Sequence, residues 1–304
     1  MAIWDILDVV AAVGTSGVGS LMFLSFGFPN SIVTPILLQA ETQFGLLSPT
    51  PFVEYTTAGC IGASFALSAA AINIHSLFIT KLSNEKDGQK TLRRILNLTL
   101  FLSWMIAQTY DGYFDLHNFP YQTGSYLWFW NGFFITCCIG IVMKLKQESS
   151  VIKELHDNFG KGSSIMDAIN AVLFLVLGVG LYTSASIHFT FMQIITPELM
   201  TCFGLLENPF EKEFGYGLET FGSGCWALSI AIVNLGTFCG DYENEDYKDT
   251  RRLMNIIAWF GIVITFTLNP GSDSFYNAYL GTALLMALIL IVKNVRNKGG
   301  YNRL

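Results

Sequence analysis

Asparagines are the polar residues that recur most regularly in the apolar stretches of this sequence. They occur in the same order in each half of the chain: Asn73, Asn97 and Asn131, then Asn234, Asn255 and Asn277. An amide in an apolar environment needs hydrogen-bond partners, and a neighbouring helix is their usual source. We therefore expect interhelical hydrogen bonds at these six positions. The alternative is a polar pocket for a ligand or pigment inside each half.

The four histidines offer little metal chemistry. His117 and His156 fall in expected loops, whereas His75 and His188 fall near the ends of apolar stretches. The sequence has no H-x-x-x-H or E-x-x-H spacing, and two histidines without a third partner do not hold a metal ion. We predict no metal site. His75 and His188 are expected to lie at the membrane interface, and the alternative is an axial ligand to a porphyrin-type pigment.

The sequence carries no recognisable catalytic motif. It has no G-x-S-x-G, no Walker loop and no dinucleotide-binding glycine turn. The adjacent Cys137 and Cys138 lie in an apolar run, with no base close to them in the sequence. Acidic residues such as Asp8 and Asp167 fall at the ends of apolar stretches, which weakens the case for a proton relay or ion-coupled pump. We therefore predict that the protein is not an enzyme.

The elements that carry these residues are expected to be membrane-spanning helices. Only 13% of the residues are charged and 52% are hydrophobic, whereas a soluble domain has about 25% charged residues. A span needs roughly 20 apolar residues. Eight stretches approach this requirement: Ile6–Phe28, Thr57–Thr80, Ile95–Tyr110, Tyr126–Met143, Ile165–Phe189, Thr220–Cys239, Leu253–Leu268 and Phe275–Val292. The fold class is therefore predicted to be an all-α integral membrane protein with eight transmembrane helices.

Basic residues predict how this bundle is oriented. All Lys and Arg except Lys212 fall after the second stretch, in the central linker, after the sixth stretch or in the C-terminal tail. By the positive-inside rule, both termini lie on the cytoplasmic, stromal or matrix face. Arginine pairs begin the third and seventh spans and are expected to anchor them at headgroup phosphates. These headgroup anchors are Arg93, Arg94, Arg251 and Arg252.

The two halves of the chain match each other in order. Arg93-Arg94 followed by Asn97 corresponds to Arg251-Arg252 followed by Asn255, and Asp5-x-x-Asp8 corresponds to Asp167-x-x-Asn170. Each copy has an even number of spans, so both copies have the same orientation, related by an axis along the membrane normal. We predict two tandem four-helix repeats, 1–146 and 163–304, joined on the inner side by a linker at 147–162.

Five further segments have an expected place in the bundle. The first outer loop of each repeat contains a short run, Ile32–Leu38 or Ile194–Met200, that is expected to form an interfacial helix. Small residues four apart, such as Gly62 and Ala66, are expected to place the second and sixth spans inside the bundle. Aromatic residues crowd the outer half of the fourth span: Trp128, Phe129, Trp130, Phe133 and Phe134. An aromatic belt at the interface explains some of them, and the others suit a lipid, a pigment or a neighbouring subunit.

These observations predict a non-catalytic accessory or structural subunit of a larger membrane complex. Its partners are expected to be the lipid bilayer and other membrane subunits, and the net charge of −6 offers no basic surface for nucleic acid. The candidate cofactors are lipid, carotenoid or chlorophyll of an energy-transducing membrane, photosynthetic or respiratory. The alternative function is a channel or transporter for a neutral or hydrophobic small molecule, with the path between the two repeats.

Overall fold

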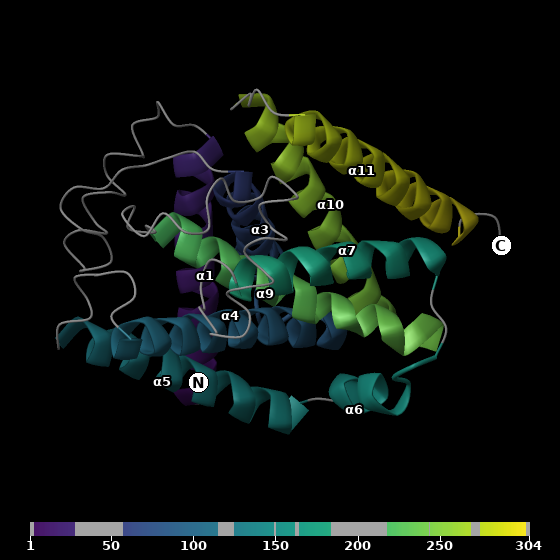
Figure 1. The fold of residues 1–304 in the computed structure, drawn as a ribbon. Coiled ribbons are helices and arrows are strands. Elements are labelled where there is room, and N and C mark those ends of the chain that lie inside the picture. Colours follow the sequence, from purple (N-terminus) through teal and green to yellow (C-terminus); the bar gives the residue numbers. More distant parts are fainter. Residues whose placement is uncertain are drawn as a thin grey trace.

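The computed structural model describes residues 3–27, 57–114, 125–148, 150–161, 164–183, 218–242, 244–268 and 274–301. These residues are almost all helical and contain no strand (Figure 1). The elements are α1 (Ile3–Gly27), α3 (Thr57–Ile74), η1 (His75–Ile79), α4 (Asp87–Phe114), α5 (Ser125–Glu148), α6 (Ser150–Asp157), α7 (Ile165–Leu181), α9 (Leu218–Asn234), η4 (Leu235–Tyr242), α10 (Glu245–Leu268) and α11 (Ser274–Tyr301).

Several of these helices have the length and composition of membrane spans. Among the described residues five segments qualify: Ile3–Leu24, Gly59–Ile79, Phe129–Gln147, Gly222–Cys239 and Glu245–Leu268. Shorter apolar helices cover Ile165–Leu181 and Asn277–Val292. The remaining expected span, Ile95–Tyr110, lies within α4, which begins with the polar turns of Asp87–Arg94. The expected interfacial helices at 32–38 and 194–200 lie outside the described residues.

Local sequence explains where two of the helices begin. Asn244 caps α10, because its Oδ1 accepts hydrogen bonds from the backbone N–H groups of Asp246 at 3.0 Å and Tyr247 at 3.3 Å. Acidic residues in the first turn of α4 and of α10 complement the helix dipoles. The two starts also meet each other: Gly88 lies so close to Asn244 and Tyr247 that a side chain there would overlap them.

Small residues bring the central helices into backbone contact. Consecutive helices lie side by side in Figure 1, α1 with α3 and α7 with α9. A Cβ on Gly19 would stand 2.6 Å from the carbonyl oxygen of Ala66, and a Cβ on Gly178 would stand 2.6 Å from that of Ala227. A side chain at Gly62 would overlap Ser223, where α3 meets α9. As expected, α3 and α9 lie inside the bundle, with 67% and 78% of their spans buried.

The two halves of the chain share one core. Helix α3 packs more extensively on α9 and α10 than on α4, and α4 in turn packs on α9. The Ser68 hydroxyl donates a hydrogen bond of 2.6 Å to the carbonyl oxygen of Met254. On the other side, the Tyr182 hydroxyl donates one of 2.9 Å to the carbonyl oxygen of Ser103. Residues 1–146 and 163–304 are therefore interleaved in space, and α6 lies in the segment between them.

Candidate functional site

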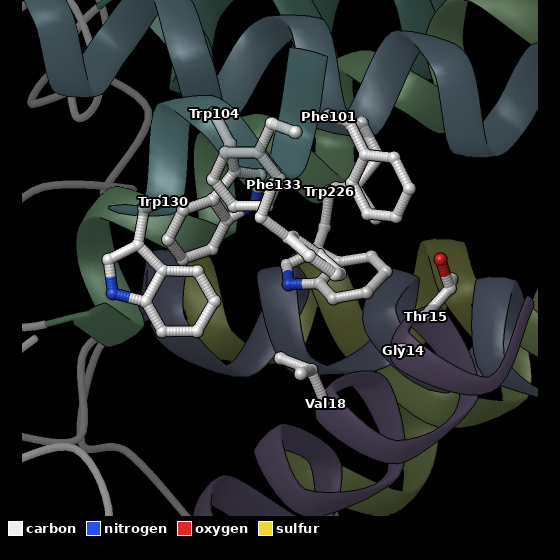
Figure 2. Close-up of a pocket in the computed structure, with 10 residues that line it drawn as sticks. Gly14, Thr15, Val18, Phe101, Trp104, Trp130, Phe133 and Trp226 are labelled. Carbon is white, nitrogen blue, oxygen red and sulfur yellow. The ribbon is translucent and has the colours of Figure 1, made fainter. Parts of the chain in front are cut away.

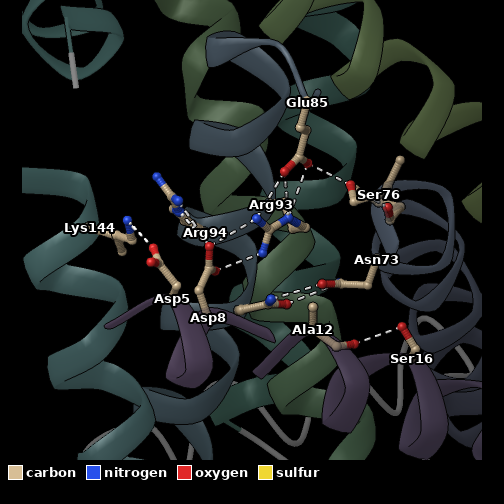
Figure 3. A network of polar contacts seen from close by, with 12 residues as sticks. Asp5, Asp8, Ala12, Ser16, Asn73, Ser76, Glu85, Arg93, Arg94 and Lys144 are labelled. Atoms are coloured by element: carbon tan, nitrogen blue, oxygen red, sulfur yellow. Dashed lines mark hydrogen bonds and ion pairs between the residues drawn. The ribbon is translucent and has the colours of Figure 1, made fainter. Parts of the chain in front are cut away.

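A buried ion network joins α1 to the start of α4 (Figure 3). Both oxygens of Asp8 accept hydrogen bonds from Arg93, at 2.8 Å from Nη1 and 3.1 Å from Nη2. Arg94 also donates to Oδ2 of Asp8, at 3.0 Å from Nε and 2.9 Å from Nη2. One carboxylate thus holds two guanidinium groups, and a second carboxylate is needed to balance their charge.

Glu85 supplies that second carboxylate from the segment between η1 and α4. Arg93 donates to Glu85 at 3.1 Å from Nε and 2.9 Å from Nη2, and the Ser76 hydroxyl donates to Oε1 of Glu85 at 2.6 Å. Burial alone would lower the pKa of the Arg93 guanidinium, but the hydrogen bonds and charges of Asp8 and Glu85 outweigh it and raise the pKa. Arg93 therefore stays charged, and the two Asp/Glu and two Arg side chains balance.

The second half of the chain contains a related ion pair. Arg252 of α10 donates from Nη2 to Oδ2 of Asp167 in α7 at 2.7 Å, and both side chains are buried. All four arginines that were expected to anchor at headgroups are 5% exposed or less. That interpretation therefore needs correction: Arg93, Arg94 and Arg252 bind carboxylates of the protein, and Arg251 is also buried.

A polar cavity of about 350 Å³ adjoins the first network. Its three cations face nearby carboxylates: Arg94 pairs with Asp8, Lys144 with Asp5, and Lys90 with Asp87 at 3.5 Å. This balance makes the cavity a poor binding site for an additional anion. The cavity is large enough for water and lies beside Asp5 and Asp8 in the first turns of α1. The ion network therefore lies at the polar end of this helix.

Four of the expected asparagines form two reciprocal pairs. Asn73 and Asn97 each donate Nδ2 to the other's Oδ1, at 3.1 and 2.9 Å, across α3 and α4. Asn234 and Asn255 do the same across α9 and α10, at 2.9 and 2.7 Å. These side chains are almost fully buried, so each amide satisfies its partner without a ligand. Their geometry is that of interhelical contacts.

The other residues singled out in the sequence lie in different surroundings. Asn131 donates to the Thr109 hydroxyl at 3.2 Å, whereas Asn277 is exposed on α11, so these two do not repeat the pairing. His75 lies in η1 with Nδ1 2.8 Å from Nε2 of Gln89. His188 lies outside the described residues. Within the described ranges, no group of three His, Cys, Asp or Glu residues is placed to hold a metal ion.

Replacing Asn73 with leucine is expected to lower the free energy of unfolding by about 1–3 kcal/mol, because the Asn97 amide would lose its buried partner. Thermal unfolding of the protein in mild detergent measures the change. The matched control is Asn277→Leu, since that side chain is exposed on α11. Equal melting temperatures for both variants would contradict a packing role for the Asn73–Asn97 pair.

An apolar pocket lies where α1, α4, α5 and α9 meet (Figure 2). Its cavity volume is about 90 Å³, and it is lined by Gly14, Thr15, Val18, Leu100, Phe101, Trp104, Trp130, Phe133, Phe134 and Trp226. The sequence had selected three of these aromatic residues, in α5, as suited to an apolar ligand. The sequence analysis did not select Trp226 or Thr15. A single tryptophan or threonine in an apolar stretch cannot be distinguished from an ordinary core residue by its sequence alone.

Two buried polar atoms in this pocket have no hydrogen-bond partner among the described residues: Nε1 of Trp226 and Oγ1 of Thr15. Both side chains are 1% exposed. In Figure 2 the Trp226 ring lies between Thr15 on one side and Trp130 on the other. Buried donors are almost always paired in folded proteins, but other buried atoms such as Nδ2 of Asn170 also lack a partner among the described residues, so these two atoms do not by themselves indicate a ligand. The exposed lining of the pocket is apolar.

A compact aromatic cluster occupies another part of the interior. Phe174 of α7 meets Phe65 edge-on, with ring centroids 5.2 Å apart, and stacks on Trp259 at 4.8 Å. Trp259 donates Nε1 to Oδ1 of Asn170 at 2.6 Å. Unlike Trp226, this buried indole has its hydrogen bond.

Comparison of the chain with protein-family models, with curated proteins and with solved structures found no match. The fold class is that of an all-helical protein with several helices able to span a membrane, and function must be argued from the site itself.

Proposed function

We propose that the protein is built from two tandem, parallel-oriented four-helix repeats that form eight spans. Contacts recurring between corresponding helices support this proposal. They are Asp8 with Arg94 and Asp167 with Arg252, Asn73 with Asn97 and Asn234 with Asn255, and Gly19 with Ala66 and Gly178 with Ala227. The contacts favour Asp8, rather than Asp5, as the counterpart of Asp167, which corrects the sequence match by about one helical turn.

A contact between equivalent positions supports a two-fold relation between the repeats. The correspondence of Asn73 with Asn234 also makes Gly62 correspond to Ser223, and these two residues touch where α3 meets α9. Positions that lie close to a two-fold axis contact their own counterparts in this way. We place both termini on the positive-inside face, since the basic residues cluster there.

We propose that this protein is a non-catalytic membrane subunit that holds an uncharged apolar molecule, of the lipid or pigment class, within a larger complex. The observation that carries the proposal is the aromatic pocket among α1, α4, α5 and α9, whose exposed lining is apolar. Aromatic side chains line many sites for apolar molecules, and a cavity of about 90 Å³ has room for a part of such a molecule. The buried charges of Asp8, Glu85, Arg93 and Arg94 support a structural role, because they neutralise one another.

The alternative function, transport of a neutral solute between the repeats, is less well supported. A path there would pass between α3 and α9, but Gly62 and Ser223 are in contact at that place. The pocket lies to one side of this contact, among α1, α4, α5 and α9. Its position suits an occupant that stays bound at the side of the bundle.

Purification in mild detergent, followed by measurement of native mass and of the absorption spectrum, tests the proposed function. We expect a mass above that of the 33.7 kDa chain, with different subunits and a bound lipid or pigment. A homo-oligomer that contains no other subunit and no bound molecule would contradict the accessory-subunit proposal. A pigment spectrum that follows the protein through purification would instead contradict a plain transporter.

A further inference from the structure

The polar cavity beside the first ion network lies where three helices reach the end of their apolar stretches. Three of its lining residues stand directly next to an expected span: Asp5 before Ile6, Arg94 before Ile95 and Lys144 after Met143. In a bilayer the headgroup region begins where the hydrocarbon core ends. The proposed spans therefore put this cavity level with the lipid headgroups, on the face where the basic residues cluster.

Charges of both signs line the cavity. Asp8 is buried between two guanidinium groups, whereas the ion pair of Asp5 with Lys144 lies nearer the surface, and the Asp5 side chain is 33% exposed (Figure 3). A carboxylate has about four acceptor sites and an ammonium group has three donors, which is more than one ion pair occupies. A ligand that carries one positive and one negative charge would contact both groups and leave the charge of the site balanced.

Lys90 is the cation of this cavity with the weakest ion pair. Its Nζ lies 3.5 Å from Oδ1 of Asp87, and the Asp87 side chain is 65% exposed. Solvent screens such a pair, so the pair stabilises the Lys90 position only slightly. Lys90 is therefore able to turn towards a negative group in the cavity while the buried network around Asp8 stays intact.

The size of the cavity and the sequence of the second repeat define how much is bound. A volume of about 350 Å³ compares with roughly 30 Å³ for one water molecule, so a phosphate and a short amine chain fit. In the proposed repeats Ser164 corresponds to Asp5, and the buried Leu290 corresponds to Lys144. The second repeat lacks both members of this ion pair, and we expect one site per chain.

We propose that this cavity binds one phosphoethanolamine group, with the ammonium of the ligand on Asp5 and its phosphate between Lys90 and Lys144. A carboxylate accepts hydrogen bonds from the N–H groups of an ammonium, and lysine is a common phosphate ligand. The group can come from a membrane lipid or from a soluble compound, and the headgroup level of the cavity favours the lipid. The inference goes beyond the proposed function, because this site is separate from the aromatic pocket.

Three lipids with the same short acyl chains test the headgroup. Native mass spectrometry of the full chain in mild detergent compares dihexanoyl phosphatidylethanolamine, phosphatidylcholine and phosphatidylglycerol. We expect one equivalent of the ethanolamine lipid, bound about tenfold more tightly than the choline lipid, which keeps the phosphate but has no N–H donor. Equal affinities for these two lipids, or a preference for the anionic glycerol lipid, would overturn the inference.

Competition with free phosphoethanolamine distinguishes the two sources of the group. If the free compound displaces the ethanolamine lipid when the two are present at equal concentration, the site takes the soluble group. If the lipid stays bound under these conditions, the acyl chains contribute to binding and the lipid is the ligand. Both results support the headgroup contacts, and we expect the second.

Two substitutions separate the ammonium contact from the phosphate contact. Asp5→Asn should reduce the preference for the ethanolamine lipid over the choline lipid to about twofold or less. Lys90→Gln should weaken both lipids alike, by about threefold to tenfold, and it removes only a screened ion pair, so its folding should not be affected. Lys146→Gln is the matched control, because Lys146 is exposed on α5 and is not among the lining residues. If Lys90→Gln binds both lipids like the control, the inference fails, whereas the proposed function depends on the aromatic pocket and is tested separately by the purification.

Discussion

Replacing Arg93 with alanine is expected to lower the free energy of unfolding by about 3–5 kcal/mol, because the carboxylates of Asp8 and Glu85 would lose a shared, buried partner. Arg93 joins α1 to the segment before α4, and it is 1% exposed. Arg94 remains on Asp8, but Glu85 would keep only the Ser76 hydroxyl among the bonds described here. Thermal unfolding in mild detergent, with helicity followed by circular dichroism, measures the loss.

Lys86→Ala is the matched control for this prediction. Lys86 forms an ion pair of 2.6 Å with Asp246, but its side chain is 70% exposed. Solvent screens such a pair, and its removal should leave the melting temperature nearly unchanged. A loss of stability no larger for Arg93→Ala than for Lys86→Ala would show that the buried network does not hold α1 to α4.

Replacing Phe174 with alanine is expected to lower the free energy of unfolding by about 3–5 kcal/mol, the usual range for removing a buried aromatic ring. Phe174 is 0% exposed, and its ring contacts both Phe65 and Trp259. The variant leaves a cavity that neighbouring helices fill only in part, since α7 is held to α9 by the close contact at Gly178. The melting temperature in mild detergent is the measurement.

The control for Phe174→Ala is Val176→Ala, two residues further along α7. Val176 is 52% exposed on the outer face of the bundle, so its truncation should have little effect. A melting temperature for Phe174→Ala equal to that of Val176→Ala would contradict the tight packing of this cluster.

Apolar stretches were sufficient to predict an all-helical fold with several helices long and apolar enough to span a membrane, because this property depends on length and composition alone. Small residues also predicted correctly that α3 and α9 lie inside the bundle, since glycine and alanine allow the closest helix contacts. The reciprocal bonds of Asn73 with Asn97 and of Asn234 with Asn255 follow from the same physics: an amide in an apolar interior pairs with another amide.

The buried charges were not predictable in the same way. Arg93 and Arg94 begin α4, where a headgroup contact and an internal ion pair have the same sequence pattern. The difference depends on Asp8, 85 residues away from Arg93, and on Glu85 in the preceding segment. The pocket was also hidden, because its unpaired indole belongs to α9 and its hydroxyl to α1. Only packing of both halves of the chain brings Trp226 and Thr15 to one cavity.

The interleaving of the two halves has a consequence for how the protein is made. Helix α4 leaves the ribosome about 100 residues before α9, and α3 leaves it earlier still. At ordinary rates of synthesis this delay is roughly 5–20 s. Throughout it, the faces of α3 that carry Gly62, Ser64 and Ser68 lack the helices that will cover them. On insertion, the first half therefore exposes the hydroxyl groups of Ser64 and Ser68 until α9 and α10 are made. Membrane chaperones and proteases have that interval in which to recognise them.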